Sequence, residues 1–255
     1  MVNAHFSHLT KRSTATSSIM SAVPSDPIFE LPTIAERICA ELKTAIIRGE
    51  LAQGAKLNEP LLAARYGISR GPLREALRRL EGLGLVDHVP HAGARVVRLT
   101  RDDLLEIYYI REALEGMAAR LAATMMSEAE IAELFALLNQ HAEQIKADAG
   151  RTYFQQEGNF DFHFRIVRAS RNPKLVQILQ GDLYHRVRMY RYQSSQQSSR
   201  PEKALLEHRR IVEAIAARDG ELAELLMRRH IQSARQAIAQ QLPAESSNIR
   251  TEVTL

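Results

Sequence analysis

The spacing of apolar residues divides this 255-residue chain into helical stretches and one short stretch of another kind. From Thr33 to about residue 82, and again from about residue 101 to residue 241, apolar side chains recur every three or four residues, as in α-helices that cover a core. Between these stretches, residues 85–89 and 94–98 form two strand-like runs on either side of Pro90–Gly93. That pattern predicts a β-hairpin. We therefore expect a mostly α protein with a single hairpin near residue 90.

Three helices precede the hairpin. The first is predicted from Thr33 to Arg48, the second follows a cap at Asn58 and stops at Gly67, and the third begins after Ser69. The four-residue hinge from Tyr66 to Ser69 joins the second helix to the third, which is the spacing of a helix-turn-helix. Residues 31–100 are therefore predicted to form an N-terminal winged helix-turn-helix domain.

The rest of the chain is predicted to be an all-α six-helix bundle covering residues 101–242. Residues 1–30 are rich in Ser, Thr and Ala, and we expect a disordered segment there and a flexible tail at residues 243–255. The six helices are expected at about 102–125, 128–147, 151–170, 173–193, 202–217 and 220–241.

The composition narrows the class of protein. The chain is 45% apolar, which is enough for a packed core, but its apolar runs fall far short of the roughly 20 residues that a bilayer requires. No secretory signal is apparent, so we expect a soluble cytoplasmic protein without a membrane partner. Cys39 is the single cysteine and is predicted to be a buried structural thiol. An internal disulfide and a four-cysteine zinc site are excluded, so any metal must be held by His and oxygen ligands.

The net charge of +4 lies in one part of the chain. Residues 31–100 hold eleven Lys and Arg against seven Asp and Glu, whereas residues 101–255 hold 21 of each. A basic domain beside a neutral one suggests that the first meets a polyanion and the second has another task.

The third helix presents the residues of a DNA interface. Arg70 and Arg74 are one turn apart and share a face that the apolar stripe does not use. Arg can donate two hydrogen bonds to guanine O6 and N7 in the major groove. A solvated basic face without a partner is the alternative, and the adjacent turn and wing favour DNA. The predicted DNA-binding residues are Ser69, Arg70, Gly71 and Arg74 on the helix and His91 and Gly93 on the wing.

These residues resemble a known family. Residues 57–63 (LNEPLLA) and 67–81 (GISRGPLREALRRLE) closely resemble the helix-turn-helix signature of GntR-family transcription regulators. Residues 93–96 (GARV) and 104–115 (LLEIYYIREALE) resemble the junction into the FCD effector domain of its fatty-acid-regulator-like subfamily. The resemblance implies a homodimer on a palindromic double-stranded DNA operator, with an effector domain that senses a small organic acid.

Three histidines of the second domain are candidates for a metal site. His163, His208 and His230 each follow the apolar stripe of their helix, and Asn159 lies one turn before His163. Several buried imidazoles without partners are costly, so a shared divalent metal is an economical explanation. The resemblance implies an acidic residue and three histidines at these four positions, where this chain has Asn159 in place of Asp. Zn, Ni, Mn or Cu would suit such a site.

The alternative for these histidines is a structural role in the core. His141 also follows an apolar stripe but fits no ligand pattern. Asp161 is a poor substitute for Asn159 as a ligand, because two residues along a helix turn a side chain by about 200°.

Arg111 continues the apolar stripe of the first bundle helix, so its charge is expected to face the core. It is a candidate clamp for an effector carboxylate, and a structural pair with Glu115 one turn later is the alternative. Arg186 and Arg188 are other candidates for the clamp.

Three functions are compatible with these features. A ligand-responsive transcription regulator accounts for both domains. A metalloenzyme is disfavoured, because no general base accompanies the histidines and an enzyme has no use for a winged helix. A DNA-binding dimer that lacks metal and effector remains the other alternative.

Overall fold

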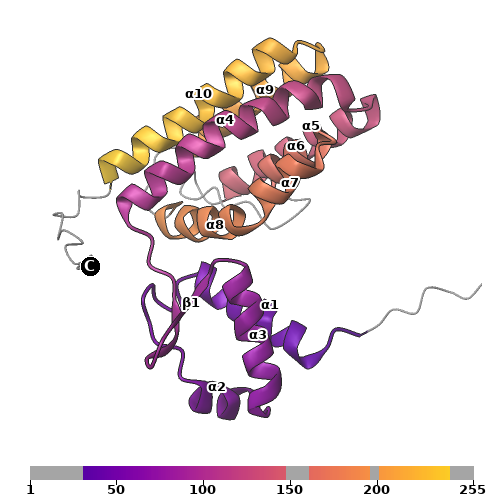
Figure 1. Cartoon of the computed structure of the whole chain (residues 1–255). Helices are drawn as coiled ribbons and strands as arrows, with labels where there is room; N and C mark the ends of the chain where they lie inside the picture. The colour runs from indigo at the N-terminus through magenta and orange to yellow at the C-terminus, as the bar shows by residue number, and fades with distance from the viewer. Residues whose placement is uncertain (1–30, 148–160, 196–200, 242–255) are drawn as a thin grey trace, which may run out of the picture. The chain divides into compact units, whose positions relative to one another are not determined.

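The computed structural model describes residues 31–147, 161–195 and 201–241, which form ten helices and one two-stranded sheet (Figure 1). The mostly α fold predicted from the sequence is confirmed. The disordered ends predicted at residues 1–30 and 243–255 lie outside the described residues. None of the helices in the described ranges is both long and apolar enough to cross a membrane.

The winged helix consists of α1 (Ile34–Ile47), α2 (Glu59–Tyr66), α3 (Arg70–Gly82), β1 (Val86–Val89) and β2 (Gly93–Val96). Thr33 and Asn58 are the N-caps of α1 and α2. Their side-chain oxygens accept hydrogen bonds from the backbone N–H groups of Glu36 and Leu61, respectively. Gly67 ends α2 in the left-handed region, at φ 62°. The short turn that follows brings α3 against both α1 and α2.

An apolar core holds α3 in place. The side chains of Leu42 and Ile46 from α1 and of Leu73 and Leu80 from α3 are fully buried. Cys39 packs on the edge of this core and is half-buried, so the prediction of a buried thiol is only partly correct. The antiparallel hairpin pairs Val86 with Val96.

The helical domain contains α4 (Arg101–Met125), α5 (Glu128–Ala147), α6 (Phe162–Ala169), α7 (Pro173–Gln180), α8 (Asp182–Ser195), α9 (Pro201–Ala216) and α10 (Gly220–Gln241). Figure 1 shows α4 and α10 running side by side over most of their length, and α9 packs against both of them. Helix α6 packs against α4 and also contacts α5. The core between these helices is built largely from Ala, Leu and Ile side chains.

Two predicted helices differ from the structure. The helix expected at 173–193 is two helices, because the backbone turns at Gly181, where ψ is −127° and a Cβ would lie 2.8 Å from the carbonyl oxygen of Gln177. The helix expected at 151–170 begins, within the described residues, only at Phe162. Asp161 has extended backbone angles and caps α6. The other four bundle helices agree with the prediction to within one residue at each end.

Candidate functional site

Helix α3 exposes the basic face that the sequence predicts. Arg70, Arg74 and Arg78 are exposed, whereas Leu73 and Leu77 on the opposite side are buried. Gly71 is also exposed and meets nothing within 4 Å, so the first turn offers close access to its backbone.

Ser69 occupies the N-cap position of α3 as predicted, but its side chain makes no capping hydrogen bond. The structure therefore leaves its exposed hydroxyl available for a partner outside the chain.

Two arginines of α3 are held by carboxylates. The Nε group of Arg74 donates to Glu59 on α2 at 2.7 Å. Arg79 donates to Glu75 at 2.7 Å and to Glu36 on α1 at 3.1 Å, so its guanidinium ties α3 to α1. These pairs are not predictable from the sequence pattern, because only the 75–79 pair has the i, i+4 spacing of helix neighbours.

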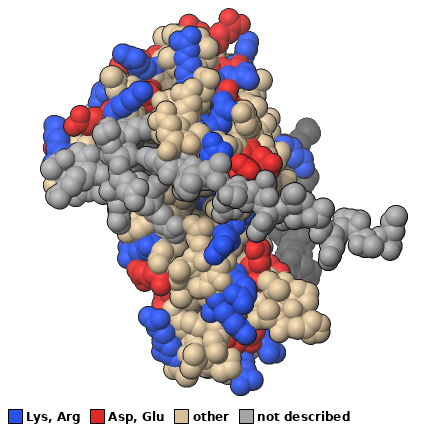
Figure 2. Space-filling view, turned by 90° about the vertical axis from the view of Figure 1, so that its left-hand side faces the viewer, with Lys and Arg blue, Asp and Glu red and all other residues tan. Residues whose placement is uncertain are grey.

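The wing ends in a three-residue turn at Pro90–Ala92. His91 is exposed there with φ 61°, a conformation that few non-glycine residues adopt. Gly93, with φ 84°, is the first residue of β2 and pairs with Val89, so it lies at the base of the turn. Charged side chains of both signs are interspersed on the face drawn in Figure 2.

The three predicted histidines come together from three helices. His163 on α6, His208 on α9 and His230 on α10 are all buried, and each offers one nitrogen within 4.8 Å of the others. The Nε2 atoms of His208 and His230 lie 3.1 Å apart. No other such group of His, Cys, Asp or Glu occurs among the described residues. His141 is buried on α5 outside the group.

Two of these imidazoles are oriented by carboxylates. The Nδ1 atom of His163 lies 2.6 Å from Glu115 on α4, and that of His230 lies 2.7 Å from Glu207 on α9. A carboxylate accepts the proton of Nδ1, which leaves the lone pair on Nε2. This is the arrangement in which histidines commonly bind metal ions.

The donor set fits a divalent metal. A tetrahedral ion with metal–nitrogen distances of about 2.0–2.1 Å would hold two nitrogens about 3.3 Å apart, close to the 3.1 Å between His208 and His230. Asn159 lies outside the described residues. Asp161 lines the pocket beside His163, but its Oδ1 atom accepts the backbone N–H groups of His163 and Phe164.

Burial governs the protonation of the cluster. Burial lowers the pKa of His163, although Glu115 opposes this effect. Burial and the neighbouring imidazoles of His230 and His163 hold the pKa of His208 well below its usual value. Neutral imidazole is the form that binds metal, so the environment favours the metal-binding state.

Glu115 also pairs with Arg111, the predicted effector residue. The Nε group of Arg111 donates to Glu115 at 2.6 Å, and both side chains are 5% exposed. Burial alone would raise the pKa of Glu115, but the charge of Arg111 and the hydrogen bonds from Arg111 and His163 hold it below its usual range. The sequence left open whether Arg111 pairs with Glu115, and the structure contains that pair.

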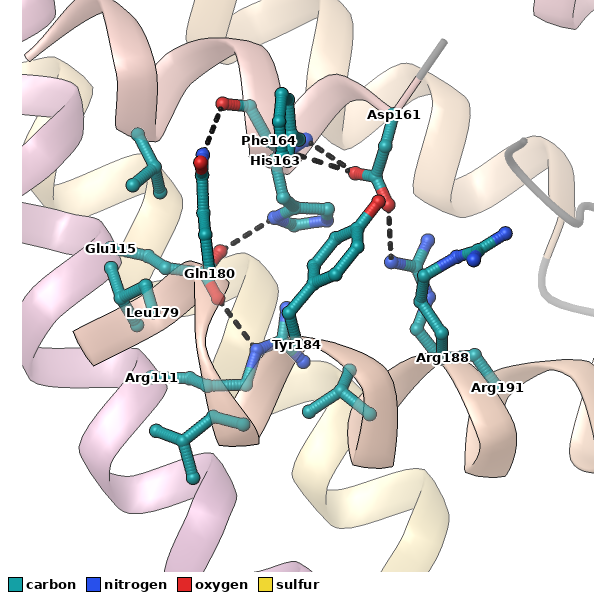
Figure 3. A pocket seen from close by; sticks show the side chains of 13 residues that line it. Arg111, Glu115, Asp161, His163, Phe164, Leu179, Gln180, Tyr184, Arg188 and Arg191 are labelled. Carbon is teal, nitrogen blue, oxygen red and sulfur yellow. Dashed lines mark hydrogen bonds and ion pairs between the residues drawn. The ribbon is translucent and has the colours of Figure 1, made fainter. Parts of the chain in front are cut away.

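A small pocket adjoins the histidine cluster (Figure 3). The space open to the centres of water-sized molecules is about 30 Å³, and apolar residues of α7 and α8 form part of the wall. Arg188 and Arg191 line it together with Arg111, whereas Arg186 is not among the lining residues. The residues drawn in Figure 3 are Arg111, Glu115, Asp161, His163, Phe164, Val167, Leu179, Gln180, Leu183, Tyr184, Val187, Arg188 and Arg191.

Both domains match known families. Residues 34–96 match the family described as bacterial regulatory proteins, gntR family, and residues 106–233 match the FCD domain. A probable D-xylose utilization operon transcriptional repressor of Paenarthrobacter nicotinovorans is 32% identical over 208 residues, which are 78% of this chain and 86% of that protein. The HTH-type transcriptional repressor RspR of Escherichia coli is 28% identical over 205 residues, 80% of this chain and 89% of that one.

A solved structure has a similar fold. The chain of E. coli McbR/YncC superposes with a TM-score of 0.65 at 24% identity, over 83% of this chain and 99% of that one. The families and relatives found are transcription regulators rather than enzymes, in agreement with the function predicted from the sequence.

Proposed function

Because the chain belongs to the GntR family of bacterial transcription regulators and carries an FCD domain, we propose that it is a repressor that a small organic acid controls. It binds a palindromic operator as a homodimer, with one winged helix on each half-site. The names of the two relatives reported above support repression. The observation that carries the proposal is the pocket, where three arginines adjoin three converging histidines.

The first turn of α3 reads the operator. Arg70 and Arg74 contact base edges in the major groove, while Ser69 and the backbone at Gly71 contact phosphates. His91 and Gly93 bring the wing to the adjacent backbone or minor groove. The exposure of the three α3 arginines supports this assignment.

A divalent metal completes the effector domain. His163, His208 and His230 bind it through one nitrogen each, and Asn159 is proposed as a fourth, neutral oxygen ligand. When bound, the metal supplies a positive charge that attracts a carboxylate oxygen. Replacing Asn159 by Asp should then tighten metal binding, because a carboxylate adds negative charge to the ligand set.

Arg111 can meet an effector while it stays paired. Only its Nε group donates to Glu115, which leaves the two Nη groups for an effector carboxylate. Arg188 and Arg191 offer further donors from α8. Such clustered guanidinium groups favour the binding of a small anion that carries at least one carboxylate.

The size of the pocket supports control by the effector. The space open to the centre of a water-sized molecule is only about 30 Å³, so an organic acid of several carbon atoms fits after side chains of the wall move. An acid that fits only after such a displacement binds the conformation with the displaced side chains better than the one without. This difference in affinity shifts the equilibrium between the two conformations.

A two-part experiment tests the proposal. A gel-shift titration at fixed salt should show that Arg70→Ala and Arg74→Ala each weaken operator binding by about 1–3 kcal/mol per half-site. A thermal-shift screen of small organic acids should find one that stabilises the wild type and changes its operator affinity, while His208→Ala binds DNA normally without responding. If both arginine variants bind the operator as tightly as the wild type, the proposed readout by α3 is contradicted. If no acid stabilises the metal-loaded protein and changes its operator affinity, the proposed effector control is contradicted.

A further inference from the structure

The pair between Glu59 and Arg74 joins α2 to the exposed face of α3. Arg74 Nε lies 2.7 Å from Glu59 Oε2, and the Arg74 side chain remains 58% exposed while that of Glu59 is only 23% exposed. Among the described residues no carboxylate holds Arg70 or Arg78, the other exposed arginines of α3. Arg74 is thus oriented by a neighbour in a way that the two others are not.

Glu59 is held by its own helix. It is the first residue of α2, where Asn58 caps the helix through the N–H of Leu61 at 3.2 Å, and Pro60 occupies the first turn. Buried Leu62 and Ala63 fix α2 within the domain core. The N-terminal end of a helix also favours a negative charge. The backbone at Glu59 is therefore fixed, and from this position its carboxylate accepts the hydrogen bond of Arg74 Nε.

This alignment decides which edge of the guanidinium reaches outward. An arginine can offer two parallel donors either from Nε and one Nη or from both Nη groups. Glu59 occupies Nε, so the two Nη groups form the outward edge. Two parallel donors match the O6 and N7 acceptors of guanine, whereas adenine presents a donor in place of O6.

The position of Glu59 beside the basic face has a second effect. Glu59, Arg74 and Arg78 line one cleft of about 190 Å³ between α3 and the hairpin. A carboxylate there repels phosphate groups and therefore weakens binding to DNA of any sequence. Its contribution to folding is small, because an exposed ion pair stabilises a protein only slightly.

We propose that Glu59 is a positioning residue for DNA readout: it holds Arg74 so that the two Nη groups select guanine, and its charge reduces binding to non-operator DNA. This inference rests on the proposed role of Arg74 in base readout. It assigns the discrimination at one base pair of each half-site to a residue on α2 that makes no base contact itself.

The test uses the full-length protein and a duplex selected from a random-sequence library with the wild type. Affinities are measured by fluorescence anisotropy for this duplex, for variants with single G·C pairs changed to A·T, and for a scrambled duplex. Glu59→Ala should lower discrimination at one guanine per half-site by about tenfold and raise affinity for the scrambled duplex. Glu59→Gln, which keeps an acceptor oxygen but loses the charge, should raise scrambled-duplex affinity equally and keep most of the discrimination.

Glu75 provides the matched control. It is an exposed carboxylate on α3 that pairs with Arg79 and leaves Arg74 untouched. Glu75→Ala should bind all duplexes somewhat more tightly without losing discrimination. In an Arg74→Ala background, Glu59→Ala should change discrimination no further.

Three outcomes would overturn the inference: full discrimination in Glu59→Ala, an equal loss in Glu75→Ala, or additive losses in the double variant with Arg74→Ala. Failure of the wild type to select any common sequence would instead refute the proposed operator binding. A Tm of Glu59→Ala within about 2 °C of the wild-type Tm confirms that the variant is folded when its DNA binding is measured.

Discussion

Replacing Arg111 by Ala should destabilise the helical domain strongly. The pair with Glu115 is 95% buried on both sides, with Nε and Oε1 2.6 Å apart. Without Arg111 the carboxylate keeps only one of its two partners, the His163 imidazole, whose pKa burial lowers. Removing one partner of a buried ion pair typically costs about 3–5 kcal/mol. Because domains are stable by only about 5–15 kcal/mol, the loss is a large part of the total.

The expected change in Tm follows from the size of the chain. For a domain of about 150–250 residues, each kcal/mol corresponds to about 2–4 °C, so Arg111→Ala should lower Tm by about 6–20 °C. Thermal and urea unfolding of chelator-treated protein would measure this. The matched control is Arg120→Ala, which removes surface ion pairs of a half-exposed arginine with Glu221 and Glu224 and should cost about 1 kcal/mol or less.

The pH dependence provides a second check on the pair. The folded-state pKa of Glu115 lies below its usual range, so the stabilisation is present above the unfolded value of about 4.3 and is lost as the pH falls below it. In Arg111→Ala, burial of the carboxyl without its arginine raises the pKa of Glu115, so the folded variant takes up a proton there at a higher pH than the folded wild type. The gap in unfolding free energy between wild type and Arg111→Ala should therefore be widest near pH 7 and narrow as the pH falls toward 4.

A double variant separates the charge from the packing. Replacing Arg111 by Met and Glu115 by Leu removes both charges and keeps apolar volume, so it should recover more than half of the lost stability. If Arg111→Ala costs no more than Arg120→Ala, the pair does not hold the domain together and the reasoning is refuted.

Three further predictions concern the histidines and the basic face. Purified, untagged protein should carry about one divalent ion per chain by elemental analysis, and His208→Ala should lose it whereas His141→Ala keeps it. After chelation, the unfolding free energy should fall as the pH drops below about 6.5, because the lowered pKa values of His163 and His208 mean that the unfolded chain binds more protons; a flat profile from pH 7 to 5 would contradict this. In gel shifts, Arg78→Ala should weaken binding to all DNA sequences alike and reduce the salt dependence of binding. Arg79→Ala should lower the Tm in thermal melting and leave DNA affinity nearly unchanged.

The periodicity of the sequence predicted most helices because burial of one helix face is a local pattern. Two errors arose where a single residue redirects the backbone. Gly181 ends α7 one residue before α8 begins, and Asp161 accepts two backbone N–H groups as a cap. Both residues lay inside stretches whose apolar spacing continued across the break, so the pattern alone could not reveal the change of direction.

The candidate site was predictable only where it depends on helix faces. The inward direction of the histidines follows from their spacing, and the i, i+4 spacing suggested Glu115 as a partner of Arg111. The second contact of Glu115, with His163, joins positions 48 residues apart and depends on how α4 packs on α6. Glu207 orients His230 across two helices in the same way. Such contacts require the tertiary arrangement, which sequence periodicity does not contain.

Glu115 makes the proposed metal and effector sites interdependent. Its Oε1 atom accepts from Arg111 and its Oε2 atom lies against His163, so one carboxylate orients a residue of each site. An acid that draws Arg111 toward the pocket changes how Glu115 holds His163, and a metal that fixes His163 constrains Glu115 in return. Linkage requires the two effects to be equal: if metal raises acid affinity by some factor, the acid raises metal affinity by the same factor. The response of the regulator to its acid would then depend on the metal supply as well as on the acid itself.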